Sequence, residues 1–155
     1  MSFYDSITEG LAGQYDRAWD SFGMLVLDLP AQNLLPVVQR LKDEFGFTLF
    51  LDVTAVDRLG REPRFDVVYH FLCPREMKRV RLKLQLPEEN LAVQTLTGLY
   101  GSARFMERET HEMYGVKFLG NDDLRPILLY EGFVGHPLRK DYPMEQEQPI
   151  VPYRK

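Results

Sequence analysis

Residues 78–86 alternate polar and apolar side chains without a break, and this alternation limits the possible folds of the chain more than any other feature. One parity holds Val80, Leu82, Leu84 and Leu86, and the other holds Arg79, Arg81, Lys83 and Gln85. Successive side chains of a β-strand point to opposite faces, so the pattern predicts a strand with one buried face and one wet or docked face. We expect the basic row to point away from the core.

Two neighbouring segments predict further strands of the same sheet. In residues 47–57, one face is expected to carry Phe47, Leu49, Leu51 and Val53, and in residues 65–73 one face is expected to carry Phe65, Val67, Tyr69 and Phe71. The links between these segments are short and contain Gly or Pro, which favours an antiparallel meander. Residues 22–29 predict a fourth strand that ends at Pro30.

Two stretches show the spacing of a helix with one apolar face. The first carries Leu34, Val37, Val38, Leu41 and Phe45, with Asn33 as a cap and Gly46 as a left-handed end. The second covers residues 89–114 and carries Leu99, Ala103, Met106, Thr110 and Met113. Gly115 is a natural C-terminal stop for it.

These elements predict one α+β domain with an antiparallel-rich mixed sheet of about four strands, two main helices and an extended C-terminal arm. Residues 1–20 are expected to form an N-terminal arm or short helix, and residues 21–115 the core. Residues 116–155 contain five prolines and no sustained period, yet they are rich in apolar side chains. Such a segment is expected to lie along a surface of its own domain or of a partner.

Composition excludes several classes of function. The net charge of −4 is too mild for nucleic acid as the main partner, and no 18-residue apolar run predicts a membrane span. Cys73 is the single cysteine, which excludes an intramolecular disulfide and a multi-cysteine metal cage; it is expected at the core, with a reactive thiol as the alternative. Glycine-rich nucleotide loops and nucleophile-elbow signatures are missing from the sequence.

Charge is unevenly distributed along the chain. Residues 58–87 carry eight basic and three acidic side chains, a net charge of +5, whereas residues 1–57 carry −6 and residues 88–155 carry −3. A basic centre can bind an acidic partner surface, or it can simply be a solvated face of the sheet.

A second charged group crowds one short helical stretch, which holds Glu107, Arg108, Glu109, His111 and Glu112. A metal site is one interpretation, but a carboxylate-bridged di-iron helix needs Glu-x-x-His, and Arg108 occupies the position three before His111. The alternatives are a solvated face with local ion pairs, and a polar interface that fixes the orientation of a partner. In the arm, Arg139 and Lys140 beside Asp141 could grip a phosphate or a carboxylate.

Three motifs, at residues 107–115 (ERETHEMYG), 120–128 (GNDDLRPIL) and 135–143 (GHPLRKDYP), resemble the signature of one protein family. This is the 30-kilodalton subunit family, also called the C subunit, of proton-pumping NADH:quinone oxidoreductase, respiratory complex I. Residues 52–57 (DVTAVD) resemble a further family motif. The sequence departs from the family at Phe105, where Trp is usual, and at Asn121 and Asp122, where His-Pro is usual.

The resemblance implies a scaffold subunit without a catalytic site, cofactor or metal of its own. It implies packing against the large hydrogenase-like subunit (the D subunit of the complex) and neighbouring peripheral-arm subunits, on the cytoplasmic side of the bacterial inner membrane. NADH, FMN, iron–sulfur clusters and quinone would then be bound by other subunits of the complex. The expected interface residues are Glu107, Arg108, Glu109, Glu112, Leu124, Arg125, Pro137, Leu138, Arg139, Lys140, Asp141 and Tyr142.

Two other hypotheses remain open at this point. The chain could be the equivalent subunit of a related membrane-bound hydrogenase or of a ferredoxin- or deazaflavin-linked dehydrogenase complex. It could also be a free-standing small enzyme that uses Glu107, Glu109 and His111.

Overall fold

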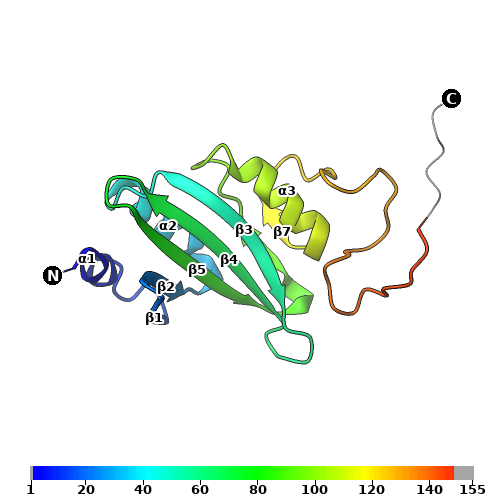
Figure 1. The fold of residues 1–155 in the computed structure, drawn as a ribbon, viewed down its shortest axis with the longest axis horizontal. Helices are drawn as coiled ribbons and strands as arrows, with labels where there is room; N and C mark the ends of the chain where they lie inside the picture. Colours follow the sequence, from blue (N-terminus) through cyan, green and yellow to red (C-terminus); the bar gives the residue numbers. More distant parts are fainter. Residues whose placement is uncertain (1, 149–155) are drawn as a thin grey trace.

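The computed structural model describes residues 2–148, and its elements are drawn in Figure 1. The helices are α1 (Phe3–Gly10), α2 (Leu34–Asp43) and α3 (Ala103–Tyr114), with short 3-10 turns η1 (Ala31–Asn33) and η2 (Glu88–Asn90). The strands are β1 (Arg17–Ser21), β2 (Met24–Asp28), β3 (Leu49–Asp57), β4 (Phe65–Cys73), β5 (Lys78–Leu86), β6 (Ala92–Gln94) and β7 (Lys117–Leu119).

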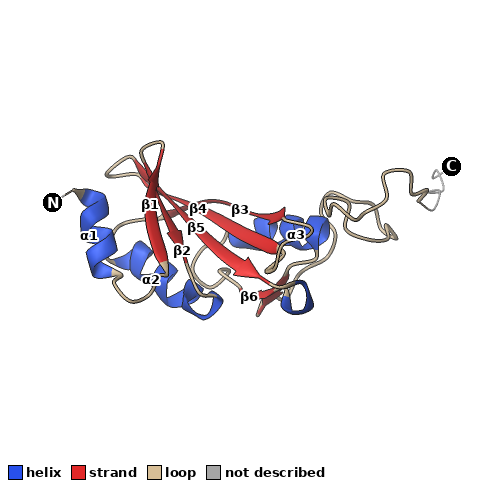
Figure 2. Cartoon of the chain, turned by 90° about the horizontal axis from the view of Figure 1, so that it is seen from below, coloured by secondary structure: helices blue, strands red, loops and turns tan. Residues whose placement is uncertain are grey.

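The main sheet has five strands in the order β1-β2-β5-β4-β3. Only the β2–β5 pair in this sheet is parallel, so the predicted α+β class and mixed, mostly antiparallel sheet are confirmed. The fifth strand is β1, which has no counterpart among the four predicted strands. Figure 2 shows α1 beside β1, α2 below the sheet and α3 next to the end of β3. A separate parallel pair joins β6 to β7.

The register predicted for the central strands is confirmed. Val80, Leu82, Leu84 and Leu86 of β5 are buried, as are Phe65, Val67, Tyr69 and Phe71 of β4. Arg79 and Gln85 are exposed, and Arg81 and Lys83 are half-buried on the opposite face. The alternation in sequence therefore reports the two faces of the sheet directly.

The face predicted for β3 is wrong at its start. Leu49 is 47% exposed, whereas its neighbour Phe50 is buried and stacks on Phe71 with ring centroids 5.0 Å apart. A register shift between Phe50 and Asp52 changes the face that each later side chain occupies. A β-bulge, which inserts an extra residue into a strand, shifts side chains between the two faces without changing the apolar composition of the strand.

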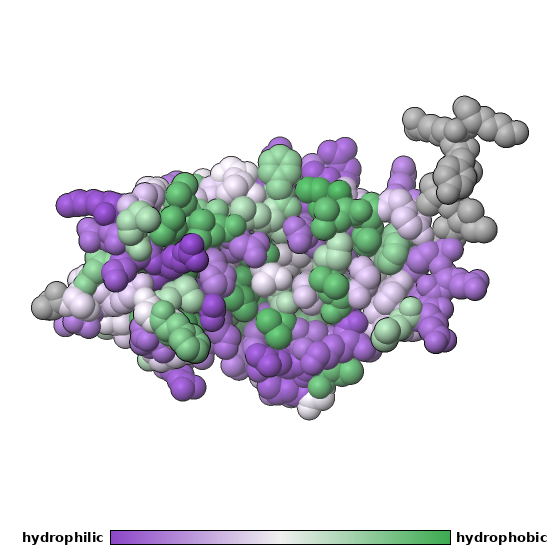
Figure 3. Space-filling view, viewed as in Figure 1, coloured by the Kyte–Doolittle hydropathy of each residue, from purple (hydrophilic) through white to green (hydrophobic). Residues whose placement is uncertain are grey.

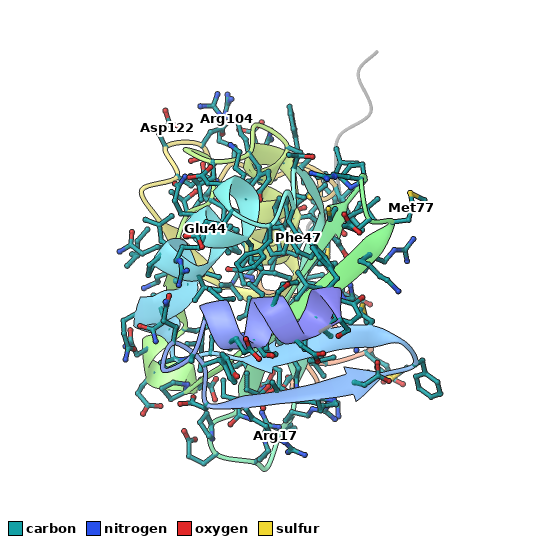
Figure 4. The ribbon with its side chains drawn as sticks, turned by 90° about the vertical axis from the view of Figure 1, so that its left-hand side faces the viewer. Arg17, Glu44, Phe47, Met77, Arg104 and Asp122 are labelled. Atoms are coloured by element: carbon teal, nitrogen blue, oxygen red, sulfur yellow. The ribbon has the colours of Figure 1, made fainter. Side chains whose placement is uncertain are left out.

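Several side chains within residues 2–21 pack into the core of the domain. Ile7 and Leu11 are fully buried, and Phe3 of α1 stacks on Phe47 with ring centroids 6.0 Å apart. Figure 4 shows Phe47 in the interior behind α1. β1 then forms the edge of the main sheet. Five residues with the pattern RAWDS carry too little apolar alternation to predict a strand.

The two main helices follow the prediction in part. α2 begins at Leu34, and Gly46 adopts the expected left-handed conformation at φ +74°. Asn33 does not cap α2, because its side-chain amide donates instead to the Gln14 carbonyl at 2.9 Å. The second helix is shorter than predicted: residues 89–102 form η2, β6 and a turn, and α3 begins at Ala103. Gly115 ends α3 at φ +82°, as expected.

Candidate docking surface

Two carboxylates of the charged helical stretch point inward, into the domain that carries them. Glu107 is fully buried and Glu112 is 7% exposed, whereas Glu109 between them is exposed. A buried carboxylate needs partners, because removing its charge from water is unfavourable unless hydrogen bonds replace the lost hydration. The contacts of Glu107 and Glu112 therefore explain what this helix does.

Glu107 holds the segment before α3 and the start of the arm together. Its Oε1 accepts from the Leu96 amide at 2.7 Å, and its Oε2 accepts from the Thr95 hydroxyl at 2.6 Å and the Asn121 amide at 2.9 Å. Burial raises the pKa of Glu107, and the three hydrogen bonds oppose that shift. Burial, together with the Glu107 charge, also raises the pKa of the Tyr69 hydroxyl.

Glu112 binds three consecutive backbone amides of the arm. Its Oε1 accepts from Ile127 at 3.2 Å and Leu129 at 2.9 Å, and its Oε2 accepts from Leu128 at 2.9 Å. Successive N–H groups that converge in this way form an anion-binding concavity in the backbone. One buried carboxylate thus fixes the path of the irregular segment that follows β7.

The arm also caps the C-terminal end of α3. The last carbonyls of a helix have no partner within it. Here the Glu112 carbonyl accepts from His136 Nδ1 at 2.9 Å, the Met113 carbonyl from the Leu138 amide at 3.2 Å, and the Tyr114 carbonyl from Arg139 Nε at 2.7 Å. A cation at a helix C-terminus is favourable because it meets the negative end of the helix dipole.

Gly115 makes this close approach possible. A Cβ at this position would lie 2.8 Å from His136 Nε2 and 3.1 Å from Arg139 Nη2. The left-handed φ of Gly115 is also disfavoured for any residue with a side chain. The glycine that ends the helix is therefore the one that lets the arm return onto it.

Arg64 anchors the far end of the arm and is only 5% exposed. Its guanidinium forms a bidentate pair with Asp57, with both N–O distances at 2.8 Å, and it reaches Glu88 at 2.8 Å and Asp141 at 2.9 Å. The Lys140 amide donates to Asp57 Oδ2 at 2.8 Å. These hydrogen bonds to Arg64 lower the pKa values of both Asp57 and Asp141. Arg64 was not predictable from the sequence, since it lies in a loop without a motif.

The outward side of α3 and the arm is rich in apolar side chains. The exposed ones are Phe105, Leu119, Ile127, Leu128, Val134, Leu138 and Met144, and Leu128 is 62% and Leu138 52% exposed. Figure 3 shows apolar surface gathered at the upper right, over α3 and the start of the arm. Folding thus turns the anchoring charges inward and leaves large apolar groups outside, which is typical of an interaction surface.

The predicted interface residues divide into two groups. Glu107, Arg108, Glu112, Arg139 and Asp141 contact the domain's own core or arm; Arg108, for example, donates to the carbonyls of Arg125 and Pro126 at 2.9 and 2.8 Å. These five residues help to hold the arm in place, because their charged groups have partners within the chain. Glu109, Arg125, Leu138 and Lys140 are exposed, although the Arg125 guanidinium also pairs with Asp123 at 2.8 Å. Leu124, Pro137 and Tyr142 are half-buried.

Within residues 2–148, no group of side chains is arranged for the metal or thiol chemistry considered from the sequence. In that range, no cluster of three or more His, Cys, Asp or Glu side chains could hold a metal ion. His111 Nδ1 lies 2.8 Å from the Val116 carbonyl, and the Cys73 thiol is buried. None of the helices in the described part of the chain is long and apolar enough to cross a bilayer.

A family model for the respiratory-chain NADH dehydrogenase 30 Kd subunit matches residues 27–148. The match runs from the end of β2 through β7 and the described arm. It therefore covers the elements that hold Glu112 and Arg64 in place.

Several curated relatives share one description, the C subunit of NADH-quinone oxidoreductase. The relative from Mesorhizobium japonicum is 44% identical over 88% of this chain and 68% of its own length. That from Phenylobacterium zucineum is 47% identical over 87% and 63%, and that from Citrifermentans bemidjiense 40% over 79% and 76%. The chain thus spans between 63% and 76% of the length of these relatives.

Two solved structures share the fold. A trypsin-resistant fragment (1-134) of Nqo5 aligns with a TM-score of 0.71 and 30% identity, over 80% of this chain and all of that one. A chain of the membrane-bound sulfane sulfur reductase, an archaeal respiratory membrane complex, aligns with a TM-score of 0.79 and 27% identity, over 92% and 84%.

Proposed function

Because this chain belongs to the 30 kDa subunit family of the respiratory-chain NADH dehydrogenase, the C subunit of NADH-quinone oxidoreductase, we propose that it is a scaffold subunit without a catalytic site of its own. The complex transfers electrons from NADH to quinone coupled to proton translocation. NADH, FMN, iron–sulfur clusters and quinone belong to other subunits. The chain's work is to present the arm in a fixed shape to a neighbour.

The exposed apolar surface of the arm carries this proposal. A flexible arm would lose conformational entropy when it docks, which weakens binding. Glu112, Arg139 and Arg64 already hold the arm on its own domain, so most of that loss occurs during folding. Leu128 and Leu138 then remain outside in fixed positions, ready for a partner.

The partner proposed for this surface is the large hydrogenase-like subunit, with neighbouring peripheral-arm subunits around it. Contact with these subunits would hold the chain at the cytoplasmic side of the bacterial inner membrane. The outward charges Glu109, Arg125 and Lys140 lie beside the apolar groups and would select the orientation of the partner.

The related-complex hypothesis is weaker than this proposal. Likeness to a chain of the archaeal sulfane sulfur reductase supports it, but that chain is 27% identical, against 40–47% for the bacterial NADH-quinone oxidoreductase relatives. The free-standing enzyme is weaker still, because Glu107 is fully buried and its carboxylate oxygens accept hydrogen bonds from within the chain.

Charge placed on the arm's apolar side tests the proposal. We expect Leu128→Asp together with Leu138→Asp to prevent incorporation of the chain into the complex in membranes, because an acidic group would be buried against the partner. Native gels and NADH:quinone activity of the membranes measure assembly. Thermal unfolding of the purified variant should match that of the unmodified chain, since both side chains are exposed.

Leu59→Asp is the matched control. Leu59 is 51% exposed in the loop between β3 and β4 and should tolerate the same change without loss of assembly. Normal assembly of the double arm variant would refute the docking role of the arm. A defect of equal size in Leu59→Asp would also refute it, because the effect would then be general.

A further inference from the structure

Two hairpin turns at the end of the sheet away from the arm expose large apolar side chains. Phe22 lies in the turn between β1 and β2, and Met77 ends the turn between β4 and β5. Their side chains are 106% and 76% exposed. β2 and β5 run parallel with Leu25 opposite Val80, so both turns lie at the same end of the sheet. Figure 4 shows Met77 projecting outward there, on the side where the β1–β2 turn also lies.

Both residues adopt a backbone conformation that disfavours them. Phe22 has φ +54° and Met77 has φ +51°, and these are the positive-φ residues other than glycine in the described part of the chain. Phe22 lies in a two-residue hairpin turn, where positive φ strongly favours Asn, Asp or Gly. Met77 lies in a four-residue turn, where the same conformation also favours Gly, Asn or Asp. Strained residues that gain no packing in return often mark a functional contact.

A groove of about 540 Å³ runs between these turns. Tyr4, Phe22 and Met77 contribute to its apolar wall, and Lys78, Arg79 and Arg81 contribute its charge. None of the described residues that line the groove is acidic. Two nearby acids lie outside the lining: Glu76, which pairs with Arg75 at 3.7 Å, and Asp20, whose Oδ1 accepts from the Gly23 amide at 3.1 Å. The groove is therefore cationic on a chain whose net charge is −4.

We propose that this groove is a second docking site, which binds an extended acidic segment of another subunit and takes an apolar side chain of that segment between Phe22 and Met77. Three cations without a lining acid select a negative segment over a neutral or basic one. The apolar tips supply burial, and their strain is compensated only when a partner covers them. The site lies away from the arm, so it does not depend on the role proposed for the arm.

A photocrosslinker placed at position 22 in the assembled complex tests the proposal. With benzoylphenylalanine in place of Phe22, we expect a crosslink to a peptide of another subunit that contains several Asp or Glu residues. A crosslink to lipid, to a basic peptide or to no molecule at all would overturn the proposal. The same probe at position 59, in the loop between β3 and β4, should not give that crosslink.

Matched charge reversals test the groove itself. Arg79 of β5 lines the groove. Arg75 lies in the turn between β4 and β5, its side chain is 91% exposed, and it does not line the groove. We expect Arg79→Glu to lower the crosslink yield roughly tenfold and Arg75→Glu to leave it unchanged. Equal losses in both variants would show a general field effect and would refute a defined site.

Phe22→Gly separates function from folding. Glycine accepts φ +54° without strain, so the purified variant should unfold at the same temperature as the unmodified chain or higher. With the crosslinker moved to position 77, we expect the yield in Phe22→Gly to fall severalfold. A lower unfolding temperature, or an unchanged yield, would contradict the assigned role of Phe22.

Discussion

Glu112→Gln is the sharpest test of how the arm is held. The carboxylate accepts two amides at Oε1 and one at Oε2. A glutamine can keep its oxygen toward two amides, but its NH2 group then faces the Leu128 N–H, donor against donor. One hydrogen bond to a charged acceptor is lost, about 1.5–3 kcal/mol, and the other two fall to the strength of neutral bonds.

The expected local destabilisation is therefore about 3 kcal/mol, which corresponds to roughly a 100-fold change in the opening equilibrium. Amide hydrogen exchange of Ile127, Leu128 and Leu129 in the full chain measures it, since their N–H groups point at the carboxylate. We expect exchange at these three amides to accelerate by about that factor, while amides of β4 exchange as before.

Glu109→Gln is the control for this experiment. It removes the same charge from the same helix, but Glu109 is exposed. In Glu109→Gln, the amides of Ile127, Leu128 and Leu129 should exchange at the same rate as in the unmodified chain. Unchanged protection in Glu112→Gln, or equal loss in both variants, would refute the claim that the buried carboxylate fixes the arm.

Three further outcomes follow from the anchors. Asp57→Asn should lower the free energy of unfolding, measured in urea, by about 3 kcal/mol, because it leaves the buried Arg64 without its bidentate partner. The pKa of Asp57 is lowered in the folded chain, so the stability that its carboxylate contributes should be complete above pH ~4 and be lost as the pH falls further. The pKa of Glu107 is raised, so ionisation weakens the fold as the pH rises above ~4, and Glu107→Gln should flatten urea stability between pH 4 and 7. Gly115→Ala should lower the thermal midpoint more than Gly13→Ala, because both have positive φ but only the first would add a Cβ within 2.8 Å of the arm's imidazole.

The long periodic segments could be predicted from the sequence because each repeats its pattern several times. β4, β5 and α2 carry four or more apolar positions at one spacing, which a single exception cannot hide. β6 and β7 have three residues each, too few to show any period. The bulge in β3 moves side chains between faces without changing the residues that carry them.

The candidate site was harder to predict because its decisive partners are backbone groups. A charged helix face is normally solvated, so the motif gave no sign that Glu107 and Glu112 are buried. The amides that Glu112 binds belong to Ile127, Leu128 and Leu129, whose side chains say nothing about a carboxylate. The resemblance drew attention to Glu107 and Glu112, whereas the direction in which each side chain points came from the structure.

The hydrogen bond from the Lys140 amide to Asp57 joins positions 83 residues apart, and it has a consequence for the order of synthesis. The Asp57–Arg64 pair is local and can form as soon as β3 and β4 leave the ribosome. The residues that complete the anchor, Lys140 and Asp141, emerge well after β3 and β4, because the hydrogen bond from Lys140 to Asp57 spans 83 positions. A nascent chain therefore has a folded sheet well before it has the complete surface that we propose for docking, so an unfinished copy would be poorly equipped to enter the complex and block a place in it.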